Sequence, residues 1–343
     1  MTTTNAPAAP ADQPAIEIRL TAPDEYRVAA DTMSGALLFP PVSDEAWAKR
    51  SSSWEETVSY TAWSGGTCVG HAAYFPFDTV VPGGARVPSG GVTRVGVRQT
   101  ARRRGIASGL LNQLTDRAAA DGLVLLSLRA SEAVIYRRFG YGVAGEIATV
   151  KIDPRRARPV RGAARGGTFR MLAAEEVLAV VPALYERCAL RRPGAITRLP
   201  SFYTRYFGPV IDRSESSYVV VHTNADGVDD GYVHYSTKWA EDGSTSRGVG
   251  EFFDVFAVDD ATELALWEFL FDIDLVSEWT SDERPIDDVV AAAVHDPRAY
   301  ERVHVDDEQW VRLIDVDAAL RARRYQAVRG GFVLDVSDPR VPA

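Results

Sequence analysis

The sequence predicts an α+β protein with two consecutive units, each built on a mixed β-sheet. Three observations lead to this prediction. Strand-like and helix-like segments alternate over residues 16–152, with a hairpin signal in the middle. Residues 153–167 are rich in Arg, Pro and Gly, which is typical of a domain boundary or linker. A second series of strands followed by a helix comes next, and this order fits an internal duplication, although no short motif repeats.

The elements of the first unit follow from hydrophobic periodicity. Ser64-Gly65-Gly66 separates two strand-like runs and indicates a hairpin. The helix predicted at 104–120 has an apolar stripe, and the run 123–128 is apolar without interruption, as in a strand that is buried on both faces. In chain order we expect strands at 16–20, 58–62, 67–75, 92–97, 123–128 and 146–152, and helices at 24–38, 104–120 and 134–139.

The second unit and the end of the chain are assigned in the same way. We expect helices at 172–187 and 261–272, and strands at 218–222, 231–239 and 250–258. A third pattern begins at Gln309, with strands at 310–314 and 331–336 around a helix at 317–323. Because about 35 residues cannot bury an independent core, this piece either packs on the second unit or belongs to a larger domain.

Composition and charge narrow the class of protein. The chain has 343 residues, with 38 Lys+Arg against 47 Asp+Glu, so its net charge is −9. Phosphate contact needs excess cationic side chains, so neither a nucleic-acid partner nor a membrane surface is expected. Residues 1–15 have no signal-peptide pattern and are expected to form a disordered tail. Cys68 and Cys188 fit free thiols in a reducing cytoplasm, so we expect a cytoplasmic protein.

The most informative stretch is VTRVGVRQTARRRGIASGLL, residues 92–111. A predicted strand leads into three consecutive arginines, Gly105 and a helix. The first amides of a helix have no internal partner and its dipole is positive there, so this position attracts anions. Three arginines at a helix start oppose the dipole unless an anion is nearby, and Gly105 tolerates backbone angles that other residues resist. The stretch predicts a pyrophosphate site.

A second stretch, LRASEAVIYRRFGYG at residues 128–142, follows a predicted buried strand. We expect Ser131 and Glu132 to cap a short helix that carries Tyr136. Taken alone, Tyr136 and Tyr141 would be interpreted as packing aromatics. Close to an anion site, the Tyr136 hydroxyl becomes a candidate proton donor.

These two stretches resemble the GNAT acetyltransferases and, more narrowly, the Eis (enhanced intracellular survival) family. ALWEFLFDID and QWVRLIDVDAALRARRY are also similar to that family, so the resemblance covers about residues 16–338. It implies a GNAT domain at 16–155, a GNAT-like domain without its own active site at 156–305, and the start of a sterol-carrier-protein-like domain at 306–343. It also implies a homo-oligomer, a hexamer in the family.

The resemblance further implies an enzyme that transfers acetyl from acetyl-CoA to an amine of an aminoglycoside, a polyamine or a lysine side chain. Tyr136 is then the general acid. The residues that would bind acetyl-CoA are Val95, Gly96, Val97, Arg102, Arg103, Arg104, Gly105, Ile106, Ala107 and Ser131. Trp47 and Arg94 are the candidates for the substrate pocket, although a core tryptophan is the simpler interpretation of Trp47.

Two departures from the family pattern affect the substrate and the base. In the family, the terminal carboxylate of a longer chain is the general base, and the present sequence ends at Ala343, so this role is expected to be missing or the sequence to be truncated. Glu132 is a speculative substitute, and a helix-start carboxylate is its simpler interpretation. Aminoglycoside-acetylating members have an acid where a rough alignment through Trp47 places Leu37.

The predicted mechanism is direct attack of the amine on the acetyl carbonyl, polarised by a backbone N–H of the strand at 95–97, with Tyr136 protonating the thiolate. The histidines His71, His222, His234, His295 and His304 are scattered without ligand spacing, so no metal is expected. Neither cysteine has a nucleophile motif. The alternative function is a catalytically weak CoA-binding module that acts as a sensor or scaffold.

Overall fold

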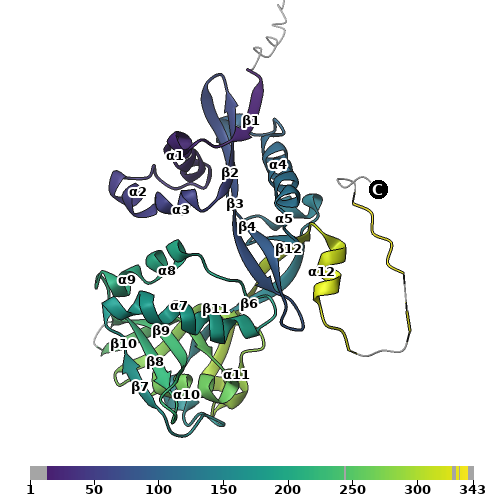
Figure 1. Cartoon of the computed structure of the whole chain (residues 1–343). Coiled ribbons are helices and arrows are strands. Elements are labelled where there is room, and N and C mark those ends of the chain that lie inside the picture. Colours follow the sequence, from purple (N-terminus) through teal and green to yellow (C-terminus); the bar gives the residue numbers. More distant parts are fainter. Residues whose placement is uncertain (1–13, 243–244, 327–329, 332, 339–343) are drawn as a thin grey trace, which may run out of the picture.

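A computed structural model describes residues 14–242, 245–326, 330–331 and 333–338. Their strands form one continuous twelve-stranded sheet in the order β1-β2-β3-β4-β5-β12-β6-β11-β10-β9-β8-β7 (Figure 1). Strands β1 to β5 come from the first unit and β11 to β7 from the second. Between them, β12 of the second unit lies beside β5, and β6 of the first unit lies beside β11. None of the helices in the described part of the chain has both the length and the apolar character that crossing a membrane requires.

The first unit agrees with the predicted elements and adds two short helices. Its strands are β1 (Ile16–Leu20), β2 (Val58–Ser64), β3 (Thr67–Val80), β4 (Arg86–Val97), β5 (Leu125–Leu128) and β6 (Gly142–Ile152). Its helices are α1 (Tyr26–Ala36), α2 (Asp44–Arg50), α3 (Ser52–Glu55), α4 (Ile106–Ala120) and α5 (Ala133–Tyr136). The sequence analysis missed α2 and α3, because each is too short to show a helical period.

Helices α1 and α4 cover opposite faces of the first sheet (Figure 1). A side chain at Gly70 would meet Ile106 and Leu110 of α4, whereas one at Gly96, which pairs with the next residue of β3, would meet Ala36 of α1. Adjacent strand positions point to opposite faces, so the two helices lie on either side. All four residues of β5 are buried, as the uninterrupted apolar run predicts.

The second unit repeats the plan of the first. Its strands are β7 (Thr168–Met171), β8 (Ser217–Thr223), β9 (Asp229–Asp242), β10 (Thr245–Ala257), β11 (Val276–Pro285) and β12 (Tyr300–Leu313). Its helices are α6 (Pro154–Ala157), α7 (Val177–Cys188), α8 (Pro200–Tyr206), α9 (Gly208–Ile211), α10 (Asp260–Phe271) and α11 (Val289–Ala293). In both units three antiparallel strands lead to a helix and then to a parallel strand. This arrangement confirms the duplication.

The two units exchange strands at their junction. Strand β12 pairs with β6 along most of its length, and its last residues, Trp310–Leu313, pair with β5 of the first unit. Strand β6 pairs on its other edge with β11 of the second unit. The sequence analysis ended the second unit at residue 305, which lies inside β12. Residues 306–313 continue this strand and belong to the sheet that both units share.

The end of the chain has the predicted helix but not the predicted last strand. Helix α12 (Val316–Ala322) forms as expected, but Ala319 packs in a cluster with Val87, Val124 and Leu125, so it covers the first unit rather than the second. The described residues of 330–338 form no strand, so the strand predicted at 331–336 is wrong. The sterol-carrier-like assignment of this segment stays a prediction.

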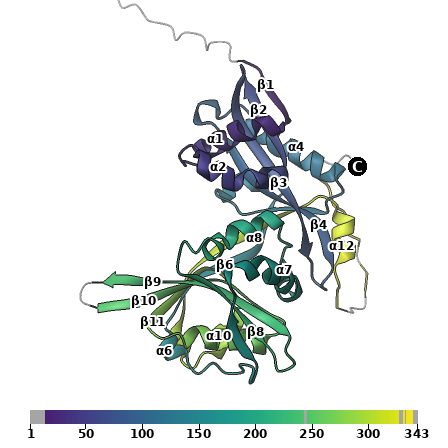
Figure 2. The same ribbon diagram turned by 60° about the vertical axis from the view of Figure 1, so that its left-hand side comes forward.

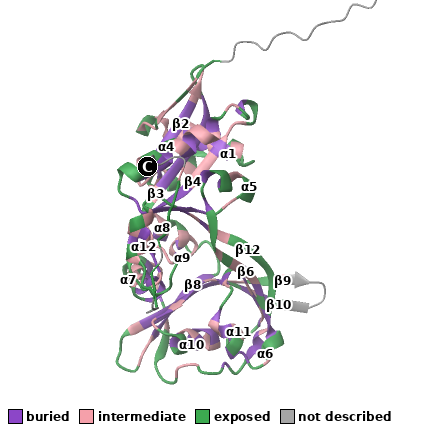
Figure 3. Ribbon diagram, turned by 90° about the vertical axis from the view of Figure 1, so that its right-hand side faces the viewer, coloured by how far each residue is buried: buried purple, intermediate pink, exposed green. Residues whose placement is uncertain are grey.

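The Arg-rich stretch at 153–167 is packed rather than a free, solvated linker. Ala157 and Val160 are buried in the core of the second unit, in the same cluster as apolar side chains of α10. The arginines bind its surface, with Arg156 paired to Asp296 and Arg158 to Asp272. Figure 3 shows that buried positions continue through both units along the strands.

Candidate active site

The centre of the candidate site is an opening between β4 and β5. The two strands pair in parallel only over Ser89–Gly91 of β4 and Leu125–Ser127 of β5. Beyond this point β4 continues to Val97, while β5 ends at Leu128. Among the described residues, the β4 segment at 93–97 has a strand partner only on the β3 side. Backbone N–H and C=O groups on the other edge are therefore available to an extended ligand.

A bulge in β4 lies at the opening. His71 pairs with Gly96 and Ala73 with Thr93, so β4 has one residue more than β3 in this interval. Arg94 takes a left-handed backbone conformation with φ of 55°. An extra residue of this kind turns the strand and changes the direction of its N–H groups. The bulge therefore takes Arg94 and Val95 out of the regular β3–β4 ladder, which includes Gly96 and Val97 again.

The loop after β4 ends at an open helix start. Gly105 is the N-cap of α4 with φ of 76°, and no side chain caps the helix. Arg103 is also left-handed, with φ of 63°. Left-handed residues such as Arg103 and Gly105 turn neighbouring backbone N–H groups toward one point. The helix dipole adds positive potential at the same place. The geometry fits an anion, as the sequence predicts.

The three arginines of this loop have different surroundings. Arg104 donates to the backbone oxygen of Pro14 (2.6 Å) and to the Ser64 hydroxyl (3.3 Å), which lie by the β1–β2 edge. Arg102 and Arg103 are exposed, and neither makes a hydrogen bond or ion pair with a described residue. Two of the three predicted cations are thus available to a ligand, while Arg104 holds the first strands in place.

Gly105, Ile106 and Ala107, at the start of α4, have different structural roles. A Cβ at Gly105 would meet nothing within 4 Å, so the left-handed backbone, rather than space, requires glycine there. The side chain of Ile106 is buried in the core beside Gly70, so only its backbone N–H faces a ligand. Ala107 is half-buried in the first turn of α4.

We expect Gly105→Ala to destabilise the fold by about 1 kcal/mol, because an L-residue resists the left-handed conformation. The free energy of unfolding from urea titration measures this effect. Gly35→Ala, in α1, is the matched control, because its Cβ also meets open space but its backbone is helical. Equal stability of the two variants would contradict the assignment.

Tyr136 ends helix α5, close to the opening. It is 8% exposed and packs edge-to-face against Tyr141, with ring centroids 5.9 Å apart. It shares one apolar cluster with Val92 and Leu128, where β4 and β5 part. Burial, helped by the charge of Glu132, raises the pKa of the Tyr136 phenol, so the hydroxyl keeps its proton at neutral pH. It accordingly has the protonation state of a general acid.

The residues before Tyr136 do not cap its helix as predicted. Glu132 occupies the N-cap position, but its side chain makes no capping hydrogen bond, and both Ser131 and Glu132 are exposed. Their exposure leaves them accessible to a ligand from solvent. Glu132 stays a speculative candidate for the base.

Arg94, predicted for the substrate pocket, is half-buried and contacts other residues of the chain, and its role toward a substrate stays a prediction. Its guanidinium lies 4.3 Å above the Trp54 ring and donates to the backbone and hydroxyl oxygens of Ser53. Burial, followed by repulsion from Arg205, lowers the pKa of Arg94 to about 10. The buried His71 ring donates from Nδ1 to the Arg94 carbonyl (2.9 Å). Arg94 therefore fastens the bulge to α3.

The predicted pocket residue Trp47 belongs to a small aromatic core on the α1 face. Its ring centroid is 5.9 Å from that of Trp54, and the Arg27 guanidinium lies over the Trp47 ring, 5.5 Å from its centroid. Burial lowers the pKa of His71, beside Trp54, to about 4, so this core carries a neutral imidazole. Sequence reasoning missed Trp54 and His71, because no motif surrounds them.

The end of α1 places apolar side chains at the mouth of the site. A Cβ on Gly96 would lie 2.8 Å from Ala36, so the α1 terminus adjoins the bulge. The next three residues are exposed by 38% (Leu37), 85% (Leu38) and 64% (Phe39). The position where aminoglycoside-acetylating relatives are expected to have an acid is thus part of an apolar loop.

The second unit packs against the first unit beside α3 and β3. Ser201 at the start of α8 donates from its backbone N–H and its hydroxyl to Glu56, just after α3. The segment before α8 pairs with β3, through Thr79 and Ile196. These long-range contacts hold the second unit against α3 and β3 of the first unit, and nothing in the local sequence indicated them.

A half-buried carboxylate, also missed from the sequence, lies beside the end of β5. Glu308 of β12 is 2.8 Å from Arg129, which directly follows β5. Burial raises the pKa of Glu308, and Glu283 adds to the effect against the opposite influence of Arg129. Glu308 therefore holds a proton closer to neutral pH than an ordinary glutamate does.

The corresponding helix start in the second unit cannot accept an anion in the same way. The Asp259 side chain already caps α10 by accepting from the Thr262 N–H (2.8 Å). Asp260 and Glu263 add negative charge to the first turn. The pyrophosphate-type arrangement therefore belongs to the first unit.

Comparisons with known proteins agree with both units. Residues 17–144 and residues 194–313 match two families, each described as an acetyltransferase (GNAT) domain. The chain is 35% identical over 318 residues to an N-acetyltransferase of Streptomyces avermitilis, covering 91% of this chain and 76% of that protein. It is 31% identical over 285 residues to the N-acetyltransferase Eis of Mycobacterium tuberculosis, covering 80% of this chain and 67% of Eis.

Solved structures give the same result. Eis1 of Mycobacterium abscessus superposes with a TM-score of 0.78 at 34% identity, covering 91% of this chain and 77% of Eis1. A GCN5-related N-acetyltransferase of Anabaena variabilis has a TM-score of 0.76 at 16% identity, which shows the fold alone. The chain spans about three quarters of the length of these proteins. Two GNAT units, one open helix start and these relatives together establish that the chain is an acetyltransferase of the Eis-like GNAT family.

Proposed function

We propose that the protein transfers an acetyl group from acetyl-CoA to a primary amine by direct attack, with aminoglycosides, polyamines and lysine side chains as candidate acceptors. The observation that carries the proposal is the alignment of three features at one place. The unpaired edge of β4 leads to the uncapped start of α4, and the buried phenol of Tyr136 lies in the cluster where β4 and β5 part.

Each part of acetyl-CoA has a matching group. The free edge at Val95–Val97 would pair with the amide groups of the pantetheine arm. The first-turn N–H groups of Ile106 and Ala107, with the exposed Arg102 and Arg103, would bind the pyrophosphate. Ser131 is exposed on the loop after β5 and could reach the same ligand. Arg104 would act indirectly, by holding the loop.

The reaction then needs no covalent intermediate on the protein. The amine nitrogen attacks the acetyl carbonyl carbon, while an N–H near the bulge stabilises the negative charge on the carbonyl oxygen. The carbon–sulfur bond breaks, and the sulfur takes the phenol proton of Tyr136. The attacking nitrogen loses its proton to a base, for which Glu308 and Glu132 are the candidate carboxylates. A homo-oligomeric assembly and a cytoplasmic location remain predictions.

Thiol release tests the proposal directly. The chain is incubated with acetyl-CoA and a panel of aminoglycosides, polyamines and lysine peptides, and free CoA is followed. Release that depends on an amine supports acetyl transfer. Binding of acetyl-CoA without release on any amine would instead favour the alternative, a CoA-binding module that acts as a sensor or scaffold. The terminal carboxylate discussed above lies outside the described residues.

The apolar loop at the site mouth leads to a prediction about acceptor choice. We expect Leu37→Asp to lower KM for a polycationic aminoglycoside by about tenfold, because a carboxylate at the mouth attracts the ammonium groups. Steady-state thiol release with tobramycin measures this effect. Leu37→Asn is the matched control, since it removes the apolar side chain without adding charge. Equal KM values for the two variants would show that charge at this position does not select the acceptor.

A further inference from the structure

The segment that carries Tyr136 is too short to hold its own shape. Helix α5 has four residues, and its N-cap makes no side-chain hydrogen bond. It continues into a single 3₁₀ turn, Arg137–Phe139, which ends at Gly140 with φ of 81°. One helical turn gains too few hydrogen bonds to offset the entropy of ordering it. The position of the Tyr136 hydroxyl therefore depends on contacts with the rest of the molecule.

Strand β12 of the second unit supplies such contacts. Its last residues, Trp310–Leu313, pair with β5. Trp310 is buried in one apolar cluster with Tyr136 and Phe139. Arg312 is two positions further along, so its side chain lies on the same face of the strand. Figure 2 shows α12, which follows β12 in the chain, beside β4 of the first unit. The end of β12 is thus built into the first unit, next to the turn that carries Tyr136.

The Arg312 guanidinium binds the backbone of this turn. Its Nη1 donates to the Phe139 carbonyl. A Cβ at Gly140 would lie 2.7 Å from the same nitrogen, so the guanidinium lies directly against the chain there. Apolar packing has no preferred direction, whereas a hydrogen bond from a charged donor fixes the carbonyl that accepts it. Arg312 therefore orients the turn, while Trp310 only packs against it.

The charge of Arg312 is buried and needs a counter-charge. Only 5% of its side chain is exposed, and its Nε has no hydrogen-bond partner among the described residues. Burying a charge is unfavourable unless it is paired, and Nη2 donates to Asp338 Oδ2, 2.7 Å away. Asp338 is half-buried, whereas residues 333–337, just before it, are exposed. This ion pair therefore attaches the segment after α12 to β12.

We propose that Arg312 is a positioning residue for Tyr136, and that Asp338 keeps Arg312 in place. The contacts run from Asp338 through Arg312 to the Phe139 carbonyl, three residues after the phenol. Without the Asp338 carboxylate, the buried guanidinium would move toward water and release that carbonyl. The inference rests on the proposed function, because Arg312 affects the reaction only through the proton that Tyr136 donates.

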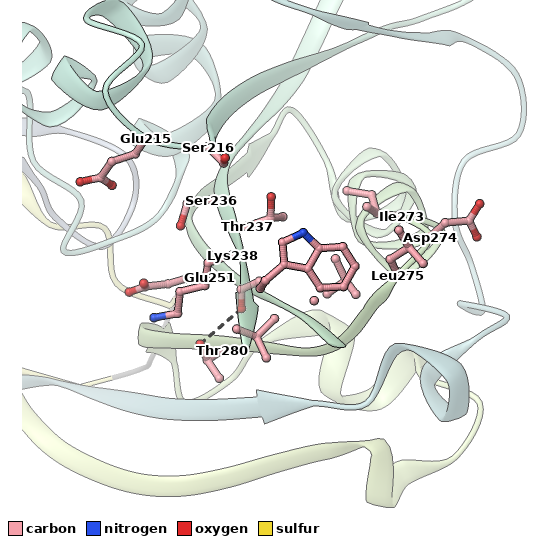
Figure 4. Close-up of a pocket in the computed structure, with 15 residues that line it drawn as sticks. Glu215, Ser216, Ser236, Thr237, Lys238, Glu251, Ile273, Asp274, Leu275 and Thr280 are labelled. Atoms are coloured by element: carbon pink, nitrogen blue, oxygen red, sulfur yellow. Dashed lines mark hydrogen bonds between the residues drawn. The ribbon is translucent and has the colours of Figure 1, made fainter. Parts of the chain in front are cut away.

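Hydrogen exchange followed by mass spectrometry tests these contacts without using activity. We expect Asp338→Asn to speed exchange of the amides at 134–141 about fivefold or more, because the turn loosens when Arg312 moves. Amides of α1 should exchange at their original rate. Two controls make the same substitution elsewhere, and neither should change exchange at 134–141. Asp335→Asn lies at an exposed position of the same segment. Asp274→Asn lies in a cavity of about 700 Å³ that β9, β10 and β11 line in the second unit (Figure 4).

Kinetics separate a positioning role from a purely structural one. We expect Asp338→Asn to lower kcat about fivefold, with little change in the affinity for acetyl-CoA, because the start of α4 is untouched. Arg312→Met should lower kcat about tenfold, and Arg312→Lys should recover part of the loss, because its ammonium can still donate to the carbonyl. In the Tyr136→Phe background, Asp338→Asn should change kcat by less than about twofold, because the phenol that it would misplace is already absent.

Two results would overturn the proposal. One is unchanged exchange at 134–141 in Asp338→Asn. The other is an equal fall in kcat with and without the Tyr136 hydroxyl, since that result indicates general damage to the fold. If Arg312→Met does not fold, Asp338→Asn carries the test by itself, because the Asp338 side chain is 29% exposed. Absence of thiol release in the unmodified chain would count against the proposed acetyl transfer, whereas hydrogen exchange would still decide whether Asp338 and Arg312 hold the turn.

Discussion

Tyr136→Phe is expected to lower kcat by about tenfold or more while leaving the affinity for acetyl-CoA nearly unchanged. The substitution removes only the hydroxyl that would protonate the leaving thiolate, and proton donation of this kind contributes roughly 10²–10⁴ in rate. The ring keeps its packing against Tyr141, so the fold should be preserved. Steady-state thiol release gives kcat, and calorimetry gives the affinity.

The pH dependence adds a readout that a purely structural role would not move. Burial raises the pKa of Tyr136 above its ordinary value of about 10, so the phenol is protonated throughout the neutral range and loses its proton only at strongly alkaline pH. We expect kcat of the unmodified chain to fall on that alkaline side, and this fall to be absent in Tyr136→Phe. Tyr141→Phe is the matched control in the same cluster and should retain turnover. Unchanged kcat in Tyr136→Phe would reject its role as the acid.

The double substitution of Arg102 and Arg103 by Ala should weaken acetyl-CoA binding by about 10- to 100-fold. Each guanidinium offers charge-assisted hydrogen bonds to the pyrophosphate, and such bonds are worth roughly 1.5–3 kcal/mol. The effective loss is smaller than the sum, because both side chains are exposed and water screens them. Isothermal titration calorimetry with CoA measures the change.

Substitutions of two other arginines are the controls for this experiment. Arg117→Ala removes a cation at the far end of the same helix, where it pairs with Asp121, and should leave CoA affinity unchanged. Arg104→Ala should affect CoA binding less than the double variant, since Arg104 binds Pro14 and Ser64. If the double variant binds CoA as tightly as the unmodified chain, the pyrophosphate assignment is wrong. The difference should also shrink at high salt.

Much of the fold could be predicted because its elements have strong local periods. The apolar stripe of α4 and the uninterrupted run of β5 identify each element by itself. Short elements such as α2, α3 and α8 could not be predicted, since one or two turns show no period. The strand predicted at 331–336 failed for the opposite reason, because a β-like composition forms a strand only where an edge is available to pair with it.

In the candidate site, too, local features could be predicted from the sequence and features that depend on distant contacts could not. The open start of α4 was predictable, since the loop, Gly105 and the helix are consecutive in the chain. The surroundings of Arg94 and Arg104 were not, because their partners Trp54 and Pro14 are distant in sequence. Glu308 was missed because β12 comes from the far end of the chain, and only the pairing of β12 with β5 brings it next to Arg129.

The sequence alone determined the kind of elements, the repeated unit and the anion-binding loop, because each depends on neighbouring residues. The tertiary structure decided which strands pair, where β4 leaves β5, and which arginines stay available to a ligand. Those outcomes depend on contacts between residues that are often more than a hundred positions apart, such as Trp310 with Leu128. Strand pairing and burial satisfy the backbone and side chains of the whole molecule together, so no local pattern contains them.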